Sequence, residues 1–273
     1  MKVQNQHGLI NHVVLLVDSS GSMNSIGSSR VREVFEAVVK RLENISRTFD
    51  QEVRVSVYFF NDNVTCARFD TDVYRVRNIF DQYRIGGSTV LLDAFEKAVG
   101  DLEKTAQMYG DHSFLLYVLT DGEENGSRTA TASSVATRIK RLDDRWTTCI
   151  QVPTQQGRMY AERYGFPREN VEIWNTANVE EAANRFERGM QNYVTSRAAG
   201  IRGTKSFFNL DVSNLNTVAV QDSLDKISAR SVKLCQNTDP KQAVEIRPLI
   251  EKATGRDYVL GHAYYQLVKK ETI

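Results

Sequence analysis

The chain is 273 residues long, which is enough for one large domain with a smaller companion. Apolar residues make up 41% of it and charged residues 25%, and these values exclude disordered, collagen-like and membrane-embedded classes of protein. The 35 basic and 34 acidic residues leave a net charge of +1, so no overall charge attracts nucleic acid or an anionic membrane. We therefore expect a folded protein whose recognition of other molecules is local.

The cysteines and the apolar segments bear on where the protein works. The three cysteines are Cys66, Cys149 and Cys235. They lie far apart without CxxC spacing, so we expect buried apolar thiols in a reducing compartment rather than a disulfide framework or a zinc site. The apolar runs 13–17 and 114–119 are too short to span a bilayer, and residues 1–10 lack the apolar core of a signal peptide. The sequence predicts a cytoplasmic protein that binds neither membranes nor nucleic acid.

The first elements predict the start of an α/β sheet. Residues 13–17 are wholly apolar and mostly β-branched, which is typical of a central strand with helices on both faces. Residues 30–49 place apolar side chains on one stripe with a 3.6-residue period, which predicts an amphipathic helix. Alternating valines in 52–60 and a return over 64–69, joined by an Asn-Asp-Asn turn, predict a hairpin at the sheet edge.

Strands and helices continue to alternate along the next part of the chain. Helices are predicted over 73–80, 92–109, 133–142, 158–164 and 179–193. Strands are predicted over 114–120, 148–152 and 171–174. This alternation predicts the α/β class, with a doubly wound, mostly parallel, Rossmann-like sheet and one antiparallel edge strand, in a domain over residues 1–199.

A second, smaller unit is expected after a glycine-containing linker at residues 200–203. It covers residues 204–273 and is predicted to be an α+β domain. Its strands are expected at 205–210, 231–234 and 263–268, and its helices at 215–227 and 243–253. The sequence does not predict how these elements pair or what this region does.

Three loops carry hydroxyl and carboxylate side chains, the hard oxygen ligands that suit Mg2+ or Mn2+ rather than softer metals. After the first buried strand, Asp18, Ser20 and Ser22 recur at every second residue, so that a curling loop can turn them toward one point. A second loop supplies the hydroxyl of Thr89 just before a helix, and Asp121 ends the second buried strand. Ligands of open α/β sheets bind beyond the carboxyl ends of the strands, which is where Asp18 and Asp121 fall.

Together these loops resemble a known site. Asp-x-Ser-Gly-Ser at 18–22, Thr89 within Gly-Gly-Ser-Thr-Val-Leu-Leu-Asp-Ala, and Thr-Asp-Gly at 120–122 look like the metal-ion-dependent adhesion site (MIDAS) of von Willebrand factor A (vWA) domains. The resemblance covers roughly residues 10–197, with every ligand position of the family present and in order. Each motif alone also fits a helix cap or a turn, and it is their joint occurrence that favours a metal site.

The resemblance assigns a role to each candidate ligand. Ser20, Ser22 and Thr89 would contact the ion through their hydroxyls, whereas Asp18 and Asp121 would act largely through bound waters. An ion with so few direct carboxylate ligands keeps much of its charge, and it can therefore attract a carboxylate from an Asp or Glu of a partner protein.

Other polar residues receive weaker interpretations. The Glu123-Glu124-Asn125 run is interpreted as a solvated loop, with added negative potential near the ion as the alternative. Asp93 either complements a helix N-terminus or supports the ligands from behind. The four histidines, which show no ligand spacing and are given no role, are His7, His12, His112 and His262.

These observations predict a metal-dependent protein-binding module rather than an enzyme, working as a subunit of a larger intracellular assembly. One alternative is a structural subunit in which the ion only stabilises loops and the C-terminal region makes the essential contact. A metal-dependent phosphohydrolase with Asp18 as nucleophile is disfavoured, because such enzymes need a second carboxylate two residues on, where this chain has Ser20. By analogy with the family, bacterial or phage complexes are a plausible setting. The partner's identity and the oligomeric state stay open.

Overall fold

The computed structural model describes residues 8–105, 107, 110–121, 123–176 and 178–213. Within them, six strands form one sheet in the order β3-β2-β1-β4-β5-β6. The strands are β1 (Leu9–Asp18), β2 (Glu52–Phe60), β3 (Val64–Asp72), β4 (Asp111–Leu119), β5 (Trp146–Val152) and β6 (Val171–Ile173). Neighbouring strands are parallel except for β2 and β3, so the predicted mostly parallel sheet with one antiparallel edge strand is confirmed.

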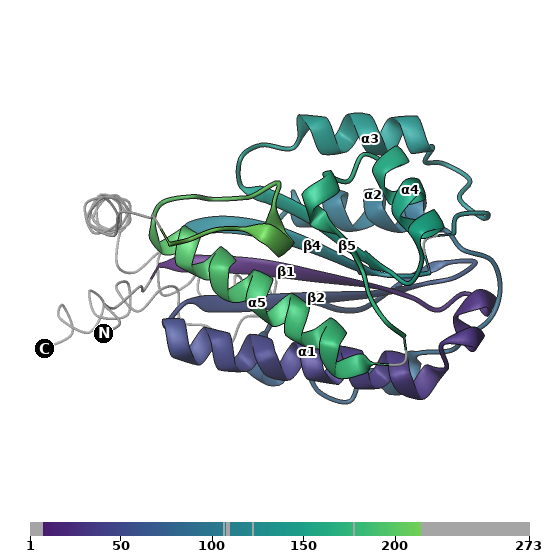
Figure 1. Ribbon diagram of the computed structural model, residues 1–273, viewed down its shortest axis with the longest axis horizontal. Helices are drawn as coiled ribbons and strands as arrows, with labels where there is room; N and C mark the ends of the chain where they lie inside the picture. Colours follow the sequence, from purple (N-terminus) through teal and green to yellow (C-terminus); the bar gives the residue numbers. More distant parts are fainter. Residues whose placement is uncertain (1–7, 106, 108–109, 122, 177, 214–273) are drawn as a thin grey trace, which may run out of the picture.

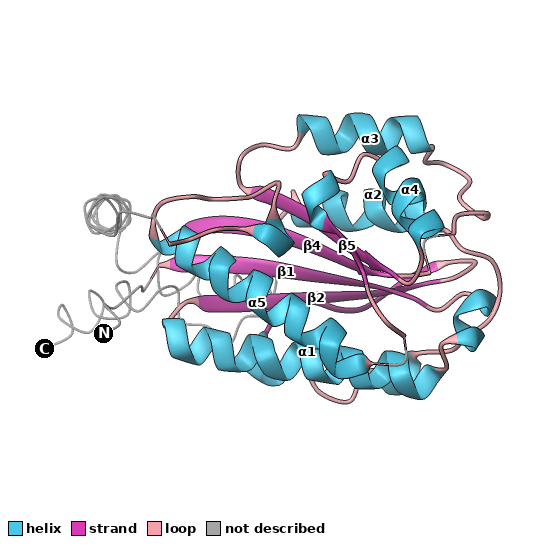
Figure 2. Ribbon diagram, in the orientation of Figure 1, coloured by secondary structure: helices cyan, strands magenta, loops and turns pink. Residues whose placement is uncertain are grey.

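Helices cover both faces of this sheet (Figures 1 and 2). On one face lie α1 (Ser28–Phe49) and α5 (Val179–Ala198), and on the other lie α2 (Leu91–Leu102), α3 (Ala132–Arg141) and α4 (Gln155–Arg163). Every residue of β1 is buried, and alternate side chains enter different cores. Val13, Leu15 and Val17 join the core under α1 and α5, whereas Val14 and Leu16 join the core under α2. Burial on both faces explains the apolar run in this strand.

Two connections differ from the sequence prediction. The helix expected over 73–80 is replaced by two short 3-10 turns, η2 (Val73–Arg75) and η3 (Phe80–Gln82). The helix expected to reach residue 109 ends at Leu102. The amides of Lys104 and Thr105 bond three residues back instead of four, to the carbonyls of Asp101 at 3.2 Å and Leu102 at 2.9 Å. In the first connection Val73, Val76 and Phe80 are buried although the segment is not an α-helix.

The segment after α5 packs back onto the sheet domain instead of starting a strand. The strand expected over 205–210 is wrong, since the chain there forms a 3-10 turn, η5 (Phe207–Asn209). Phe207 is fully buried, and its amide donates to the Asn170 side-chain oxygen at 2.5 Å. The amide of Thr204 donates to the Thr147 hydroxyl at 2.8 Å. These contacts explain why the chain does not form a strand here: its aromatic residues complete a core that already exists.

The elements predicted at 215–227, 231–234, 243–253 and 263–268 lie outside the described residues. The second domain expected over 204–273 therefore stays a prediction.

The described part of the chain bears on the expectations for membrane spans and for the cysteine thiols. No helix there has the length and apolar character to cross a bilayer. Cys149 is buried in β5 as expected, but Cys66 is exposed, because the edge strand β3 is covered less completely than the central strands. Both thiols are free, and Cys235 lies outside the described residues.

Two histidines that the sequence left without a role meet inside the fold. His12 Nε2 lies 2.9 Å from His112 Nδ1, and His12 Nδ1 lies 3.0 Å from the Asp70 carboxylate. Arg54 pairs with the same carboxylate at 2.8 Å. Sequence spacing could not reveal this buried network, because it joins neighbouring strands that are far apart along the chain. His7 and His262 lie outside the described residues.

Candidate metal centre

Asp18 forms the base of the candidate site. It is the last residue of β1 and its side chain is fully buried. One carboxylate oxygen accepts the Ser20 amide at 2.8 Å, and the other accepts the Thr120 hydroxyl at 2.5 Å. The hydroxyls of Ser20 and Ser22 lie 3.0 Å apart. The first loop therefore curls as the sequence predicts, with its serines turned toward each other above a fixed carboxylate.

The charge on Asp18 is poorly compensated. Burial raises the pKa of Asp18 to about 6, partly opposed by the hydrogen bonds from Ser20 and Thr120, and the nearby charge of Asp121 raises it further. Among the described residues, no Lys, Arg or His forms an ion pair with Asp18 or Asp121. Two neighbouring carboxylates without a basic partner favour the binding of a cation.

The second loop crosses closely over the first. The Gly86 amide donates to the Ser19 carbonyl at 2.9 Å, and the Gly21 amide donates to the Gly87 carbonyl at 3.0 Å. A Cβ at Gly21 would lie 3.3 Å from that carbonyl, and Gly87 has a φ of +78°, so glycine suits both positions. These backbone bonds bring the loop that contains Thr89 to the Asp18 loop.

Thr89 is held by its backbone and keeps its hydroxyl available. Its amide donates to the Asn125 side-chain oxygen at 2.8 Å, and its carbonyl accepts the Gly126 amide at 2.9 Å. The residue is only 1% exposed. Among the described residues, the Thr89 hydroxyl has no hydrogen-bond partner. The hydroxyl therefore has the capacity to bind a ligand such as a cation.

The third loop carries Asp121 and is fixed to α2 by Glu124. Asp121 is half-buried, and one of its carboxylate oxygens accepts the Glu123 amide at 3.1 Å. The Glu124 carboxylate accepts the Leu92 amide in the first turn of α2 at 3.0 Å and the Ser127 amide at 2.7 Å. The interpretation of this run as a solvated loop is therefore wrong for Glu124, which caps a helix.

Asp93, in the first turn of α2, supports the residues that follow this loop. Its carboxylate accepts the amides of Arg128, Thr129 and Ala130, at 2.8, 3.1 and 2.7 Å. Burial alone would raise the pKa of Asp93, but these bonds and one from the Thr129 hydroxyl together lower it below its ordinary value. Of the two roles considered for Asp93, the contacts favour support of the loop next to the candidate ligands.

Tyr83 is a member of the site that the sequence did not indicate. Its hydroxyl donates to the backbone carbonyl of Asp18 at 2.6 Å. Burial, and then the charges of Asp18 and Asp121, raise the pKa of Tyr83, so it stays protonated and donates. It follows the 3-10 turn η3, in a connection where no sequence pattern marks a functional residue.

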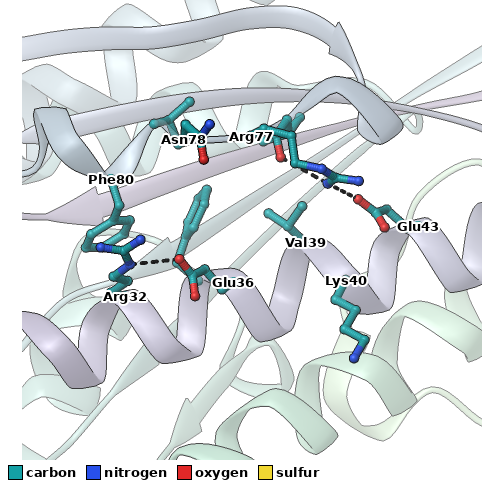
Figure 3. A pocket seen from close by; sticks show the side chains of 11 residues that line it. Arg32, Glu36, Val39, Lys40, Glu43, Arg77, Asn78 and Phe80 are labelled. Atoms are coloured by element: carbon teal, nitrogen blue, oxygen red, sulfur yellow. Dashed lines mark hydrogen bonds and ion pairs between the residues drawn. The ribbon is translucent and has the colours of Figure 1, made fainter.

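A separate groove of about 330 Å3 lies between α1 and residues 76–80 (Figure 3). Two ion pairs lie along it: Arg32 bonds to Glu36 within α1 at 2.8 Å, and Arg77 reaches across to Glu43 of α1. Phe80 forms part of its lining and packs against Tyr83 with ring centroids 4.5 Å apart. The groove thus shares an aromatic wall with the candidate metal centre but has none of its hydroxyls.

The comparisons with known proteins agree with this geometry. Residues 12–161, more than half of the chain, match the sequence model of the von Willebrand factor type A domain. The chain belongs to this family. The vWA domain identified by resemblance is thereby confirmed, while an intact MIDAS and a cytoplasmic bacterial or phage type stay predictions. No curated protein matches the chain.

Solved structures with the vWA fold include a von Willebrand factor type A protein from Catenulispora acidiphila, with 15% identity, a TM-score of 0.50, and matches over 67% of this chain and 43% of that one. A mutant of the PilB minor pilin from Streptococcus sanguinis has 11% identity and a TM-score of 0.52, and the match covers 70% of this chain and 63% of the pilin. The vWF domain of the type V pili tip protein Mfa5 from Porphyromonas gingivalis has 10% identity and a TM-score of 0.51, and the match covers 71% of this chain and 97% of that domain. This chain thus matches less than two thirds of the first two structures, and such identities show the fold alone.

The donor set of this vWA domain fits a hard divalent cation. In the described residues, no group of three or more His, Cys, Asp or Glu side chains comes together to hold a metal, so an ion would depend on hydroxyl oxygens. Serine and threonine hydroxyls backed by carboxylates are suited to Mg2+ or Mn2+. The structure gathers the loops of Asp18, Ser20, Ser22, Thr89 and Asp121 at one end of the sheet, and their role as ligands stays a prediction.

Proposed function

We propose that this vWA domain is a metal-dependent protein-binding module. Ser20, Ser22 and Thr89 would hold Mg2+ or Mn2+ through their hydroxyls, with Asp18 and Asp121 behind them. The observation that carries the proposal is the fully buried, unpaired carboxylate of Asp18, which lies next to a second carboxylate and beneath hydroxyl oxygens. When bound, the cation would supply a positive charge that attracts a carboxylate of a partner protein.

The residues of the chain prepare the site in separate ways. Thr120 and the Ser20 amide orient the Asp18 carboxylate, so little rearrangement accompanies binding. The Asn125 side chain orients Thr89 by accepting a hydrogen bond from the Thr89 backbone amide. We propose a binding role rather than catalysis because Ser20 stands where a phosphohydrolase of this type needs its second carboxylate. We also propose a cytoplasmic setting as part of a larger assembly, which the two free thiols support.

The proposal is tested by Mg2+ titration of the full chain and by partner capture with and without EDTA. We expect Mg2+ binding in calorimetry, loss of partner capture in EDTA, and recovery when excess Mg2+ is added. Ser22→Ala should weaken Mg2+ binding, while Ser29→Ala, which removes an exposed hydroxyl at the start of α1, should leave it unchanged. Capture that persists in EDTA and in Ser22→Ala would contradict a metal-dependent mode of binding.

The affinity for Mg2+ is expected to fall as the pH falls through about 6. Burial raises the pKa of Asp18 to about 6 in the metal-free protein, so the carboxylate is ionised at pH 7.5 and protonated at pH 5. A proton then competes with the cation, and affinity should drop by about tenfold per pH unit below 6. Titrations at pH 7.5, 6 and 5 measure this change. A constant affinity over that range would mean that Asp18 is not involved.

A further inference from the structure

The turn between β2 and β3 holds the second loop of the candidate site on both sides of Thr89. The Asp62 carboxylate accepts the Ser88 amide at 2.8 Å and the Ser88 hydroxyl at 2.6 Å. The backbone carbonyl of Asn61 accepts the Val90 amide at 3.0 Å. The hairpin therefore bonds to both residues that flank Thr89, although it supplies none of the candidate ligands.

The shape of the loop is adapted to this carboxylate. A Cβ at Gly87 would lie 2.2 Å from one Asp62 oxygen, so the Asp62 side chain occupies the space that a larger residue would need. A Cβ at Gly126 would lie 2.5 Å from the Ser88 hydroxyl. Ser88 is thus in contact with both the hairpin and the third loop, and the loop that carries Thr89 is fixed by contacts from both.

Gly86 and Gly87 would otherwise leave this loop free to adopt many conformations. Asp62 counteracts that freedom at Ser88, the residue next to the candidate ligand Thr89. We propose that Asp62 is a positioning residue that fixes the Thr89 loop for cation binding without contacting the cation, an inference that rests on the proposed function. The chain thus uses its antiparallel edge hairpin as a brace for the metal centre.

Asp62→Asn distinguishes two ways in which Asp62 could favour cation binding: by positioning the Thr89 loop, or by attracting the cation with its negative charge. Asp62→Asn keeps an oxygen that accepts from Ser88 but removes the charge, whereas Asp62→Ala removes both. We expect Asp62→Ala to weaken Mg2+ binding by about tenfold, equivalent to about 1.4 kcal/mol, and Asp62→Asn to stay within about twofold of wild type. Asp81→Ala, which removes another exposed carboxylate, serves as the control. Equal weakening in both Asp62 variants would overturn the proposal in favour of a charge effect.

Hydrogen exchange in the absence of metal tests separately whether Asp62 holds the Thr89 loop in place. In EDTA, hydrogen exchange of peptides covering residues 86–90 should be at least about tenfold faster in Asp62→Ala than in wild type or Asp62→Asn. Unchanged exchange would overturn the proposal even if the affinity falls. If the wild-type protein binds no Mg2+, the proposed function fails and so does the link to cation binding. The exchange result then decides only whether Asp62 holds the loop.

Discussion

Replacing Asp18 with Asn is expected to abolish Mg2+ binding and, in EDTA, to stabilise the protein by up to about 3 kcal/mol. The gain follows from the buried charge: the pKa of Asp18 rises from 3.8 to about 6, mainly through burial, and each pKa unit corresponds to about 1.4 kcal/mol. Asn can still accept the Ser20 amide, so the loop keeps its shape. Urea unfolding at pH 7.5 in EDTA measures the stability, and calorimetry measures Mg2+ binding.

The sign of this effect depends on pH. Because the pKa of Asp18 is raised in the folded state, its contribution to stability is fully present below pH 3.8 and is lost as the pH rises through about 6. The difference between Asp18→Asn and wild type should therefore be largest above pH 6 and should shrink toward pH 4. Asp81→Asn, at an exposed carboxylate, is the control and should change neither property. An Asp18→Asn protein that is less stable in EDTA, or that binds Mg2+ normally, would contradict this account.

The Asp18 carboxylate, which is expected to cost stability but to bind a cation, differs from the other buried acidic group in the sheet. Asp70 is also almost fully buried, but Arg54 and His12 surround it, so its charge is compensated within the protein. Asp18 has hydroxyl and amide donors instead of a basic side chain. A buried carboxylate left in this state costs stability, and sites that bind ligands commonly carry such costs. The contrast supports a cation, rather than the fold alone, as the reason for Asp18.

The sheet and its helices could be predicted because their side-chain patterns are strong and local. All ten residues of β1 are buried, and the apolar stripe of α1 runs the length of the helix. The segment 73–80 is not a helix, although its apolar residues Val73, Val76 and Phe80 have helical spacing. That spacing also results when separate 3-10 turns cross α1, and only tertiary packing distinguishes the two cases.

The candidate ligands were predictable from three short motifs, but their supports were not. Thr89 and Asp121 follow recognisable loop patterns, whereas Tyr83 contacts the Asp18 backbone from a distant connection. Asp62 and Glu124 bond to residues between 26 and 32 positions away in the chain. Contacts of this kind depend on how loops cross in the folded state, and a single sequence carries no local signal for them.

Phe207→Ala is expected to lower the free energy of unfolding of the vWA domain by roughly 3–5 kcal/mol. The ring is fully buried, with centroids 6.0 Å from Phe186 and 6.4 Å from Tyr193, two residues of α5. A Cβ at Gly189 would lie 2.5 Å from this ring, so α5 has a glycine where Phe207 packs. Removing the ring leaves a cavity between the helix and the sheet. Urea unfolding followed by tryptophan fluorescence measures the loss.

The same experiment tests where the vWA domain ends. Phe69→Ala is the matched control, because Phe69 is a partly exposed phenylalanine on the edge strand β3 and its removal should cost far less. A chain that ends at residue 203 should lose at least as much stability as Phe207→Ala, since it lacks both the ring and the bond from Thr204 to Thr147. If instead residues 204–213 belonged to an independent second domain, both changes would leave the unfolding of residues 8–203 unaltered. The buried ring and the bond to Asn170 make Phe207 part of the core of the vWA domain, so we expect both changes to lower its stability.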